Sequence, residues 1–492
     1  MTSEAAAAPA ADSERAQEVD ERRTTAIALV VATVFFMESF DSTVIATALP
    51  AMADSFNRAP EDLSIGLTSY LLALAVFLPV SGWVADRVGP RLVFSTAIAL
   101  YVSASVLCGL ADGLASFTAA RLAQGAAGAM LIPVGRMVVL RSATKSELLR
   151  AIAFITWPTF AAPVLGPPIG GFLATYASWR WIFFINIPLG IVVFIAAIRL
   201  LPRSMDTTPR RFDAVGFILM ALGCCGLMYG LEMLSREGSS VLPYVGLITA
   251  SAVVGWSAVR HLRRAVSPLV DLQPLGIDTF AVPMRGGSFF RMSMAATPFL
   301  LPLLFQVGFG MNAFESGMLV LSVFVGNLLM RPVITRVLRA YGFRRVLVLN
   351  GTLSAASIIA CGLFSADTPV WAMVVVLFAG GVFRSVQVTA QITLTFADVP
   401  QSMMTSASAL SSLIVQLTIA MGVAVGALAV RMVGVAAPDL AGTAGQYRWA
   451  LVVVGAIGLL AVFDARRLAP DAGAEVTGHR SPTPIESSDE KG

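Results

Sequence analysis

Apolar stretches of about 20 residues recur along almost the whole chain, separated by short segments that carry charged residues, Pro and Gly. A helix of about 20 apolar residues spans the hydrocarbon core of a bilayer, because each residue adds about 1.5 Å. The pattern predicts an all-helical protein that crosses the membrane many times. Fourteen spans are expected, near 25–48, 64–84, 92–111, 117–140, 148–175, 181–201, 213–233, 242–260, 279–305, 314–337, 346–364, 370–396, 404–430 and 447–465.

The composition agrees with a membrane solvent. Of the 492 residues, 57% are hydrophobic and 13% are charged, and the mean hydropathy is +0.78. Charged residues make up about 25% of an ordinary soluble domain. A water-exposed surface cannot be built from this sequence, so a soluble protein is excluded.

The basic residues indicate how the chain is oriented in the membrane. Nearly all are Arg and lie scattered in short loops, so the net charge of +4 forms no patch that would follow a nucleic-acid backbone, and no nucleic-acid partner is expected. Basic clusters recur in every second loop. Because Lys and Arg in short loops tend to stay in the cytoplasm, this alternation predicts that both termini are cytoplasmic.

Neither a metal nor a cofactor is expected. The four cysteines, Cys108, Cys224, Cys225 and Cys361, all fall in apolar segments and are interpreted as small buried side chains. Lys145 lacks the glycines of a phosphate-binding loop, so ATP is not the expected energy source.

The span pattern predicts two halves joined by an inserted pair of helices, an arrangement that places a transporter's site between the halves. The segments expected are a disordered cytoplasmic tail over 1–24, a six-helix half over 25–202, a linker with two extra spans over 203–265, a second six-helix half over 266–467 and a disordered cytoplasmic tail over 468–492.

Several motifs stand in order along the first half. They are Asp41-Ser42-Thr43-Val44 with Ala48-Leu49-Pro50, the loop 82–91, Arg121-Leu122-Ala123-Gln124-Gly125, Gly166-Pro167-Pro168-Ile169-Gly170-Gly171, and the run 179–188. With these motifs the sequence resembles the major facilitator superfamily, in particular its fourteen-span drug/proton antiporter branch, over residues 25–467. It departs from the family pattern at Leu92, Ala153 and Ala162, where a basic residue and two glycines are usual.

The resemblance implies a transporter that exports drugs in exchange for protons by alternating access. It also implies a multi-pass protein of a bacterial plasma or inner membrane that works as a monomer, with protons and a small molecule as its partners.

Proton coupling is predicted at the first and fourth spans. Asp41 is an ionisable group deep in an apolar span, where it is costly unless it pairs or faces water, and Glu38 lies three residues earlier on the same helical face. Two carboxylates this close can share a proton. Arg121 needs an acid, a carbonyl or water, and in the resembling family the matching Arg takes part in proton coupling. The alternative for Asp41 and Arg121 is a static brace between helices.

Five further arginines fall within predicted spans. Arg136, Arg285 and Arg331 are close enough to span ends to reach the cytoplasmic interface. Arg291 and Arg384 lie deeper and are candidates for a cavity that binds an anion, which favours a small organic anion as the alternative substrate.

The substrate cavity and the gating elements complete the candidate site, with ordinary helix packing as the alternative for each residue. The cavity candidates are Phe36, Phe40, Trp157, Asn186, Phe290, Arg291, Gln306, Asn327, Arg384, Gln387, Gln391 and Gln416. The gating candidates are Gly82, Asp86, Arg87, Gly89 and Arg91 in the loop after the second span, and Gly166, Pro167, Gly170 and Gly171 in the fifth.

Functions of other classes find less support. A membrane enzyme should cluster a nucleophile, a base or metal ligands at one face, and a channel should repeat a pore loop. The sequence contains neither pattern. A proton-coupled exporter of small amphipathic molecules is therefore the leading prediction, and a sensor or an embedded enzyme ranks below the anion exporter.

Overall fold

The computed structural model describes residues 7–142, 148–201, 212–235, 241–469 and 471–474, and these contain helices and no strand. The helices are α1 (Ala7–Phe56), α2 (Ser64–Val88), α3 (Pro90–Gly109), α4 (Leu114–Ser142), α5 (Leu148–Tyr176), α6 (Trp181–Phe184), α7 (Asn186–Leu200), α8 (Ala214–Leu234), α9 (Val241–Leu262), α10 (Asp278–Leu303), α11 (Ala313–Cys361), α12 (Val370–Ala397), α13 (Met404–Ala436) and α14 (Ala444–Ala465). Short helices include η1 (Pro60–Leu63), and a single π-helical turn, η3 (Leu304–Gly308), extends α10. The predicted all-helical class is confirmed.

Twelve helices in the described part of the chain are long and apolar enough to cross a membrane. One of them, α11, has 49 residues and contains two of the spans that the hydropathy pattern predicts, 314–337 and 346–364. It breaks at Gly342, whose φ of 71° is a conformation that favours glycine. The helix α5 has 29 residues, four of them Pro, and is not among the twelve.

The N-terminal tail differs from the prediction. The segment 1–24 was expected to be disordered, yet α1 begins at Ala7 and continues without interruption into the first span. The segment is rich in alanine, the residue with the highest helix propensity, and the span behind it supplies a formed helix to extend. Residues 1–6 and 475–492, which belong to the two predicted tails, lie outside the described residues.

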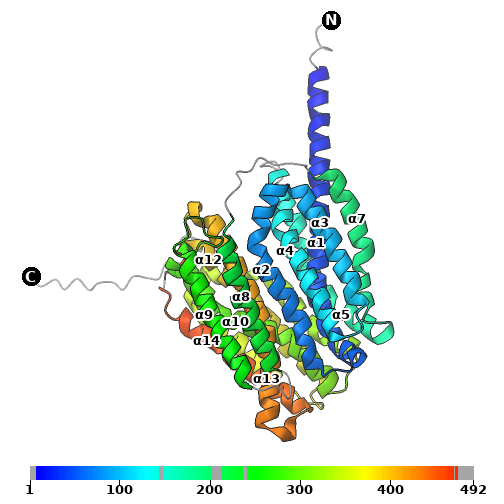
Figure 1. The fold of residues 1–492 in the computed structure, drawn as a ribbon, viewed down its shortest axis with the longest axis vertical. Coiled ribbons are helices and arrows are strands. Elements are labelled where there is room, and N and C mark those ends of the chain that lie inside the picture. The colour runs from blue at the N-terminus through cyan, green and yellow to red at the C-terminus, as the bar shows by residue number, and fades with distance from the viewer. Residues whose placement is uncertain (1–6, 143–147, 202–211, 236–240, 470, 475–492) are drawn as a thin grey trace, which may run out of the picture.

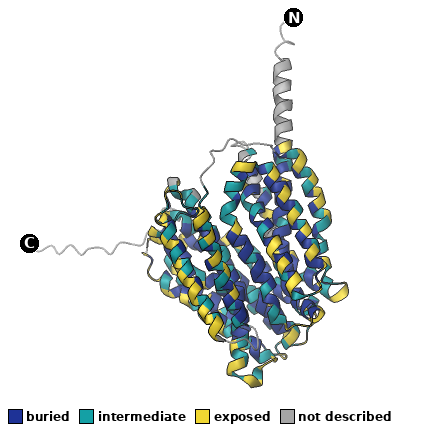
Figure 2. Ribbon diagram, viewed as in Figure 1, coloured by how far each residue is buried: buried dark blue, intermediate teal, exposed yellow. Residues whose placement is uncertain are grey.

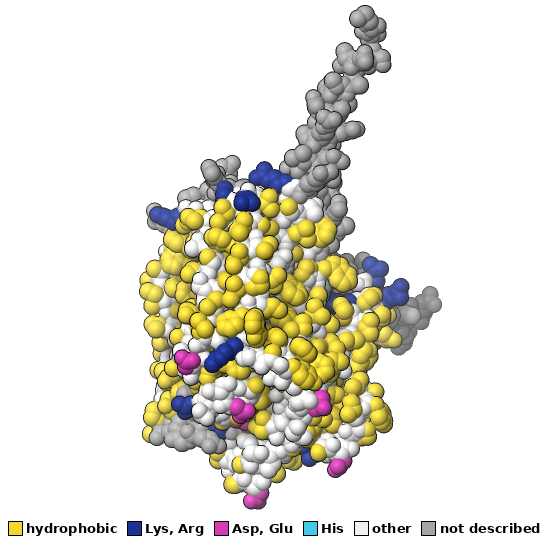
Figure 3. Space-filling view, turned by 90° about the vertical axis from the view of Figure 1, so that its right-hand side faces the viewer, with side chains coloured by type: hydrophobic (Ala, Val, Ile, Leu, Met, Phe, Trp, Pro, Cys, Tyr) yellow, Lys and Arg dark blue, Asp and Glu magenta, His cyan; other side chains and the backbone are white. Residues whose placement is uncertain are grey.

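The long helices gather into two bundles (Figure 1). Helices α1 to α7 contact one another, as do α10 to α14, while α8 and α9 pack as a pair. The surface is dominated by hydrophobic side chains, and the acidic side chains visible in Figure 3 lie toward the end opposite the N-terminus. Large apolar residues such as Val192, Leu349 and Trp371 are exposed, which suits contact with lipid. Buried residues concentrate between the helices (Figure 2).

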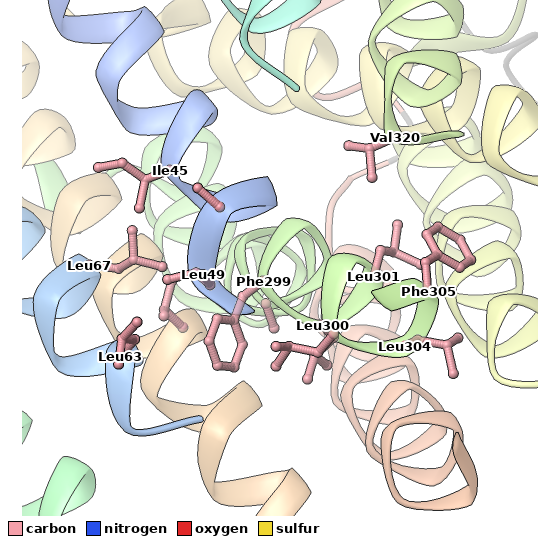
Figure 4. Close-up of a cluster of buried hydrophobic side chains, with 14 of the residues drawn as sticks. Ile45, Leu49, Leu63, Leu67, Phe299, Leu300, Leu301, Leu304, Phe305 and Val320 are labelled. Atoms are coloured by element: carbon pink, nitrogen blue, oxygen red, sulfur yellow. The ribbon is translucent and has the colours of Figure 1, made fainter. Parts of the chain in front are cut away.

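The two bundles share one core at the end away from the N-terminus. There Ile45 and Leu49 of α1 belong to the same buried cluster as Phe299 and Leu300 of α10 and Val320 of α11 (Figure 4). Toward the other end the cores separate. One large cluster draws only on α1 to α5 and α7, and another only on α10, α11, α12, α14 and the residues just after it. The bundles are thus sealed against each other at one end. Toward the other end each has a large core of its own, and a smaller cluster with Ala75 of α2, Phe280 of α10 and Leu410 of α13 still joins them.

Polar contacts reinforce the sealed end. The Gln306 side-chain amide donates to the backbone carbonyl of Thr47 at 2.9 Å, and the Tyr447 hydroxyl donates to the Glu61 carboxylate at 2.6 Å. Each bond joins the first bundle to the second. We call the contact between the two bundles at this end the seam. Gln306, which was predicted to line the substrate cavity, lies at the seam.

The pair α8–α9 is attached to both bundles. The buried Glu232 carboxylate of α8 accepts a hydrogen bond at 2.6 Å from the Ser64 hydroxyl at the start of α2. Two residues further, the carbonyl of Leu234 accepts a hydrogen bond from Arg431 of α13. At the N-terminal end of α8, the Asp213 carboxylate accepts a hydrogen bond from His261 of α9 at 2.9 Å. The inserted helices are seated against the junction of the bundles.

Glycines of α5 allow the closest approaches of the helices. A Cβ at Gly170 would lie 2.4 Å from the carbonyl oxygen of Val44 on α1, and one at Gly171 would lie 2.3 Å from that of Ala313 on α11. In return, a Cβ at Gly317 of α11 would lie 2.3 Å from the carbonyl oxygen of Pro167. The glycines predicted for gating therefore pack α5 against its own bundle on one side and across the seam on the other.

Gly171→Ala is expected to lower the Tm of the purified protein in detergent. The new methyl group meets backbone rather than a movable side chain, and overpacking of this kind costs about 1–3 kcal/mol. The matched control is Gly246→Ala on α9, where a Cβ meets nothing within 4 Å. Thermal unfolding followed by fluorescence compares the two, and equal Tm values would contradict the close packing.

Candidate functional site

A buried ion pair lies at the centre of the first bundle. The Arg121 guanidinium of α4 donates to Asp41 Oδ2 of α1 at 2.5 Å, and the two side chains are 1% and 0% exposed. In an apolar interior either charge alone would be strongly destabilising, and removal of one partner from such a pair typically costs 3–5 kcal/mol. The two residues predicted for proton coupling from separate spans are thus brought into direct contact.

Arg121 is held on several sides. It donates to the Gln124 amide oxygen at 2.6 Å and to the backbone carbonyl of Gly66 at 3.3 Å, and its guanidinium carbon lies 4.2 Å from the centre of the Tyr70 ring. Asp41 is held less completely, because its buried Oδ1 has no hydrogen-bond partner in the described part of the chain. One oxygen of the carboxylate is therefore available to accept a proton or a water molecule.

Glu38 joins the same network through a tyrosine. It is 8% exposed and accepts a hydrogen bond from the Tyr70 hydroxyl at 3.2 Å, while the Tyr70 ring lies against Arg121. Glu38 is therefore linked to the Asp41–Arg121 pair through Tyr70. Tyr70 was not predicted, although a polar aromatic residue within an apolar span is a signal that could have identified it.

A second layer supports Arg121 from behind. The Gln124 side-chain amide donates to the Ser105 hydroxyl at 3.2 Å, and the Asn186 amide donates to the same hydroxyl at 2.9 Å. Asn186 is only 1% exposed. This residue was predicted to line the substrate cavity, and the structure places it in the buried network, at the start of α7 and bonded to Ser105 of α3.

The second bundle holds two deep arginines in different surroundings. Arg291 of α10 is 6% exposed and donates to Thr418 at 3.3 Å, to Gln391 at 3.0 Å and to the carbonyl of Pro283 at 2.9 Å. All three of its nitrogens have acceptors. Arg384 of α12 has neither a hydrogen bond nor an acidic partner within the described residues.

The other cavity candidates do not converge on one surface. Phe36 and Phe40 stack with their ring centres 5.6 Å apart, and Phe40 and Phe290 are each 3% exposed. Gln387 accepts a hydrogen bond from Asn350 at 3.2 Å within the second bundle. Trp157 is largely exposed, and Asn327 and Gln416 are half-buried.

The predicted gating loop lies where α2 gives way to α3. Gly89 has a φ of 96° and separates the two helices, and the Arg87 guanidinium lies 5.7 Å from the centre of the Trp83 ring. A Cβ at Gly82 would meet nothing within 4 Å, so that glycine is not required by packing. Asp86 and Arg91 flank this turn, and Arg91 is half-buried.

The peripheral arginines agree with interfacial positions. Arg136 and Arg331 are exposed, and Arg285 is 61% exposed with Asp464 3.9 Å away. Among the described residues there is no group of acidic, His and Cys side chains that could hold a metal ion.

Comparison with known proteins identifies the family. The model of the major facilitator superfamily matches residues 31–270 and 284–486. The chain belongs to the major facilitator superfamily. The putative multidrug resistance protein MdtD of Escherichia coli O139:H28 is 36% identical over 407 residues, which cover 82% of this chain and 86% of the relative. MdtD of Shigella sonnei shows the same identity and coverage.

Solved structures of other transporters share the fold. A D-xylose–proton symporter aligns with a TM-score of 0.65 at 14% identity, covering 91% of this chain and 99% of the symporter. A peptide transporter of the POT family aligns with a TM-score of 0.66 at 16% identity, covering 91% and 97%. With its apolar helices and bacterial relatives, this superfamily member is a multi-pass transporter of the bacterial inner membrane, not an enzyme.

A double-mutant cycle measures the ion pair. Arg121→Gln alone and Asp41→Asn alone should each lower stability, because each leaves a buried charge without its partner. The double variant should lose less than the sum of the two single losses. Thermal unfolding in one detergent gives the three values, and strictly additive losses would show that the two charges do not stabilise each other.

Proposed function

We propose that the protein exports small amphipathic molecules in exchange for protons, with Asp41 as the main proton-binding group. The observation that supports this most directly is the Asp41–Arg121 pair. Asp41 is fully buried, has a charged partner on one oxygen and has no partner for the other within the described residues. A carboxylate in this setting exists in two protonation states that differ in their attraction to a neighbouring helix.

The proton acts through the charge balance of the first bundle. When Asp41 is ionised, it neutralises Arg121 and holds α4 against α1. When it is protonated, the charge attraction is lost, and Arg121 keeps only Gln124, the Gly66 carbonyl and the Tyr70 ring. Glu38 takes part through its bond to Tyr70. Protonation thereby changes the relative stability of two arrangements of the helices.

Alternating access uses the two bundles as rigid units. We assign fourteen spans, counting α11 twice about its break at Gly342 and including α5. The halves are 25–202 and 266–467, and the linker 203–265 carries α8 and α9. With both termini in the cytoplasm, the sealed end faces outward, and the end where each bundle has a large core of its own faces the cytoplasm. The protein works as a monomer.

Drug-like substrates are favoured by the relatives, which are named as putative multidrug resistance proteins. The alternative is a small organic anion. Arg291 gives this alternative little support, because its nitrogens already have protein acceptors. Arg384 is the arginine that favours it.

Asp41→Asn is expected to abolish transport driven by a pH gradient, because the amide cannot exchange a proton. The protein is reconstituted in proteoliposomes with an imposed pH gradient, and uptake is measured for a panel of cationic, neutral and anionic compounds. The Asn variant should remain monodisperse on gel filtration, although with a lower Tm. Unchanged gradient-driven transport would rule out Asp41 as the proton carrier.

Asp54→Asn is the matched control. It makes the same substitution on the same helix at an exposed position, so gradient-driven transport should be retained. Glu38→Gln tests the contribution of the second carboxyl group. A partial loss of gradient-driven transport is expected, because Glu38 is linked to the ion pair through its hydrogen bond to Tyr70.

A further inference from the structure

The arginine at the middle of α12 differs from the other deep arginines of the described chain. Arg121 is neutralised by Asp41, and Arg291 donates from all three nitrogens to protein oxygens. Arg384 is half-buried, and its recorded contact is with the Phe324 ring, whose centre lies 5.6 Å from the guanidinium carbon. Its hydrogen-bond donors are therefore free within the described residues.

A free cation at this depth is costly. Ionisable residues within spans almost always pair or face a water-filled cavity, and they mark pathways for substrates or ions. A contact with an aromatic ring is worth about 0.5–2 kcal/mol and supplies no counter-charge. The positive charge of Arg384 therefore has no counter-ion among the described residues, and its guanidinium is free to bind an anion.

Arg384 lines a pocket between α10, α11 and α12. The other lining residues combine apolar side chains with hydroxyls and one glycine, and include Leu301, Leu377, Thr297, Ser354, Ser357 and Gly380. The volume of about 30 Å³ exceeds the roughly 10–15 Å³ that one water needs, so a group of carboxylate size fits. A Cβ at Gly380 would lie 3.2 Å from the Ser357 hydroxyl, so the glycine keeps part of this space open.

We propose that this pocket binds the acidic group of an amphipathic anion, with Arg384 as its charged contact. The guanidinium presents paired donors that match a carboxylate, and the apolar lining suits the carbon atoms next to it, while the rest of an aromatic or aliphatic body extends beyond the pocket. The proposal rests on the proposed transport function and names its substrate class as monoanions with an apolar body. A cationic compound would meet like charge there.

A ligand with a carboxylate on an apolar body can reach the protein from the aqueous phase or from the membrane. Three aromatic probes test the charge: 2-naphthoate, its methyl ester and 2-naphthylmethylamine. Decanoate represents the membrane source. Binding to the full chain in nanodiscs is measured by calorimetry at one pH. Naphthoate should bind at least about tenfold more tightly than the ester or the amine, since a hydrogen-bonded charge adds about that much or more.

Arg384→Gln should weaken naphthoate binding by about ten- to a hundredfold, and Arg384→Lys should recover part of it. Gly380→Val is a second variant that fills the pocket and leaves the charge in place, and it should weaken binding as well. The control is Arg339→Gln, an exposed arginine on the neighbouring α11, which should bind naphthoate normally. Each variant is compared by gel filtration before binding is measured.

Binding of naphthoate, of decanoate or of both, with loss in Arg384→Gln, supports the assignment, and decanoate alone places the ligand's source in the membrane. Equal affinity for the ester, or unchanged binding in both Arg384→Gln and Gly380→Val, overturns it. The transport proposal fails separately, because it requires loss of gradient-driven transport in Asp41→Asn, a variant that leaves the Arg384 pocket intact.

Discussion

The structure depends on one constraint: a charge that is completely buried in the apolar interior needs a partner of opposite charge or hydrogen-bond partners close to it. Asp41 and Arg121 satisfy it together, and the residues around them are arranged to serve the pair. Gln124, Ser105 and Asn186 form a chain of side-chain hydrogen bonds that fixes the guanidinium from behind. Since the ionised pair is neutral, it can be buried completely, and for the same reason a proton added to Asp41 changes the whole local balance.

Packing determines where the bundles can part. At the sealed end backbone meets backbone, because Gly171 and Gly317 bring α5 and α11 within reach of each other's carbonyls. Contacts this close are sensitive to separation, since a gap of about 0.5–1 Å already removes about a quarter to a half of the dispersion energy. At the other end each bundle has a large core of its own, and the shared packing is confined to smaller clusters such as that of Ala75, Phe280 and Leu410. Separation of the bundles at that end would therefore leave the large core of each bundle intact.

Much of this could be predicted from the sequence. Helical class and repeated spans follow from hydropathy alone, and the isolated charges Asp41 and Arg121 stand out because apolar spans rarely contain any. Sequence could not distinguish Arg291 from Arg384. Both are arginines within spans, and the difference lies in acceptors that come from other helices, such as Thr418 and Gln391 for Arg291.

The predictions for Asn186 and Gln306 have a similar basis. Asn186 and Gln306 were assigned to a cavity because they are polar residues in apolar spans, a pattern that also describes residues that join helices to one another. Asn186 binds Ser105 of α3, and Gln306 binds a carbonyl of α1. The helix that begins at Ala7 has another origin: the segment lies before the first apolar span and was predicted as a tail, but its alanine content and the adjoining span extend the helix.

The inserted helices are also hydrogen-bonded to both bundles. Glu232 ties α8 to Ser64 of α2, and Arg431 of α13 binds the carbonyl of Leu234, so a single helix end is bonded to both bundles. If the sealed end opens by separation of α2 from α13, α8 can follow only one of them. It has to leave either the hydroxyl of the first bundle or the guanidinium of the second. The buried Glu232 carboxylate or the half-buried Arg431 guanidinium would then lose one of its partners, and the inserted pair adds that cost to the opening of the seam.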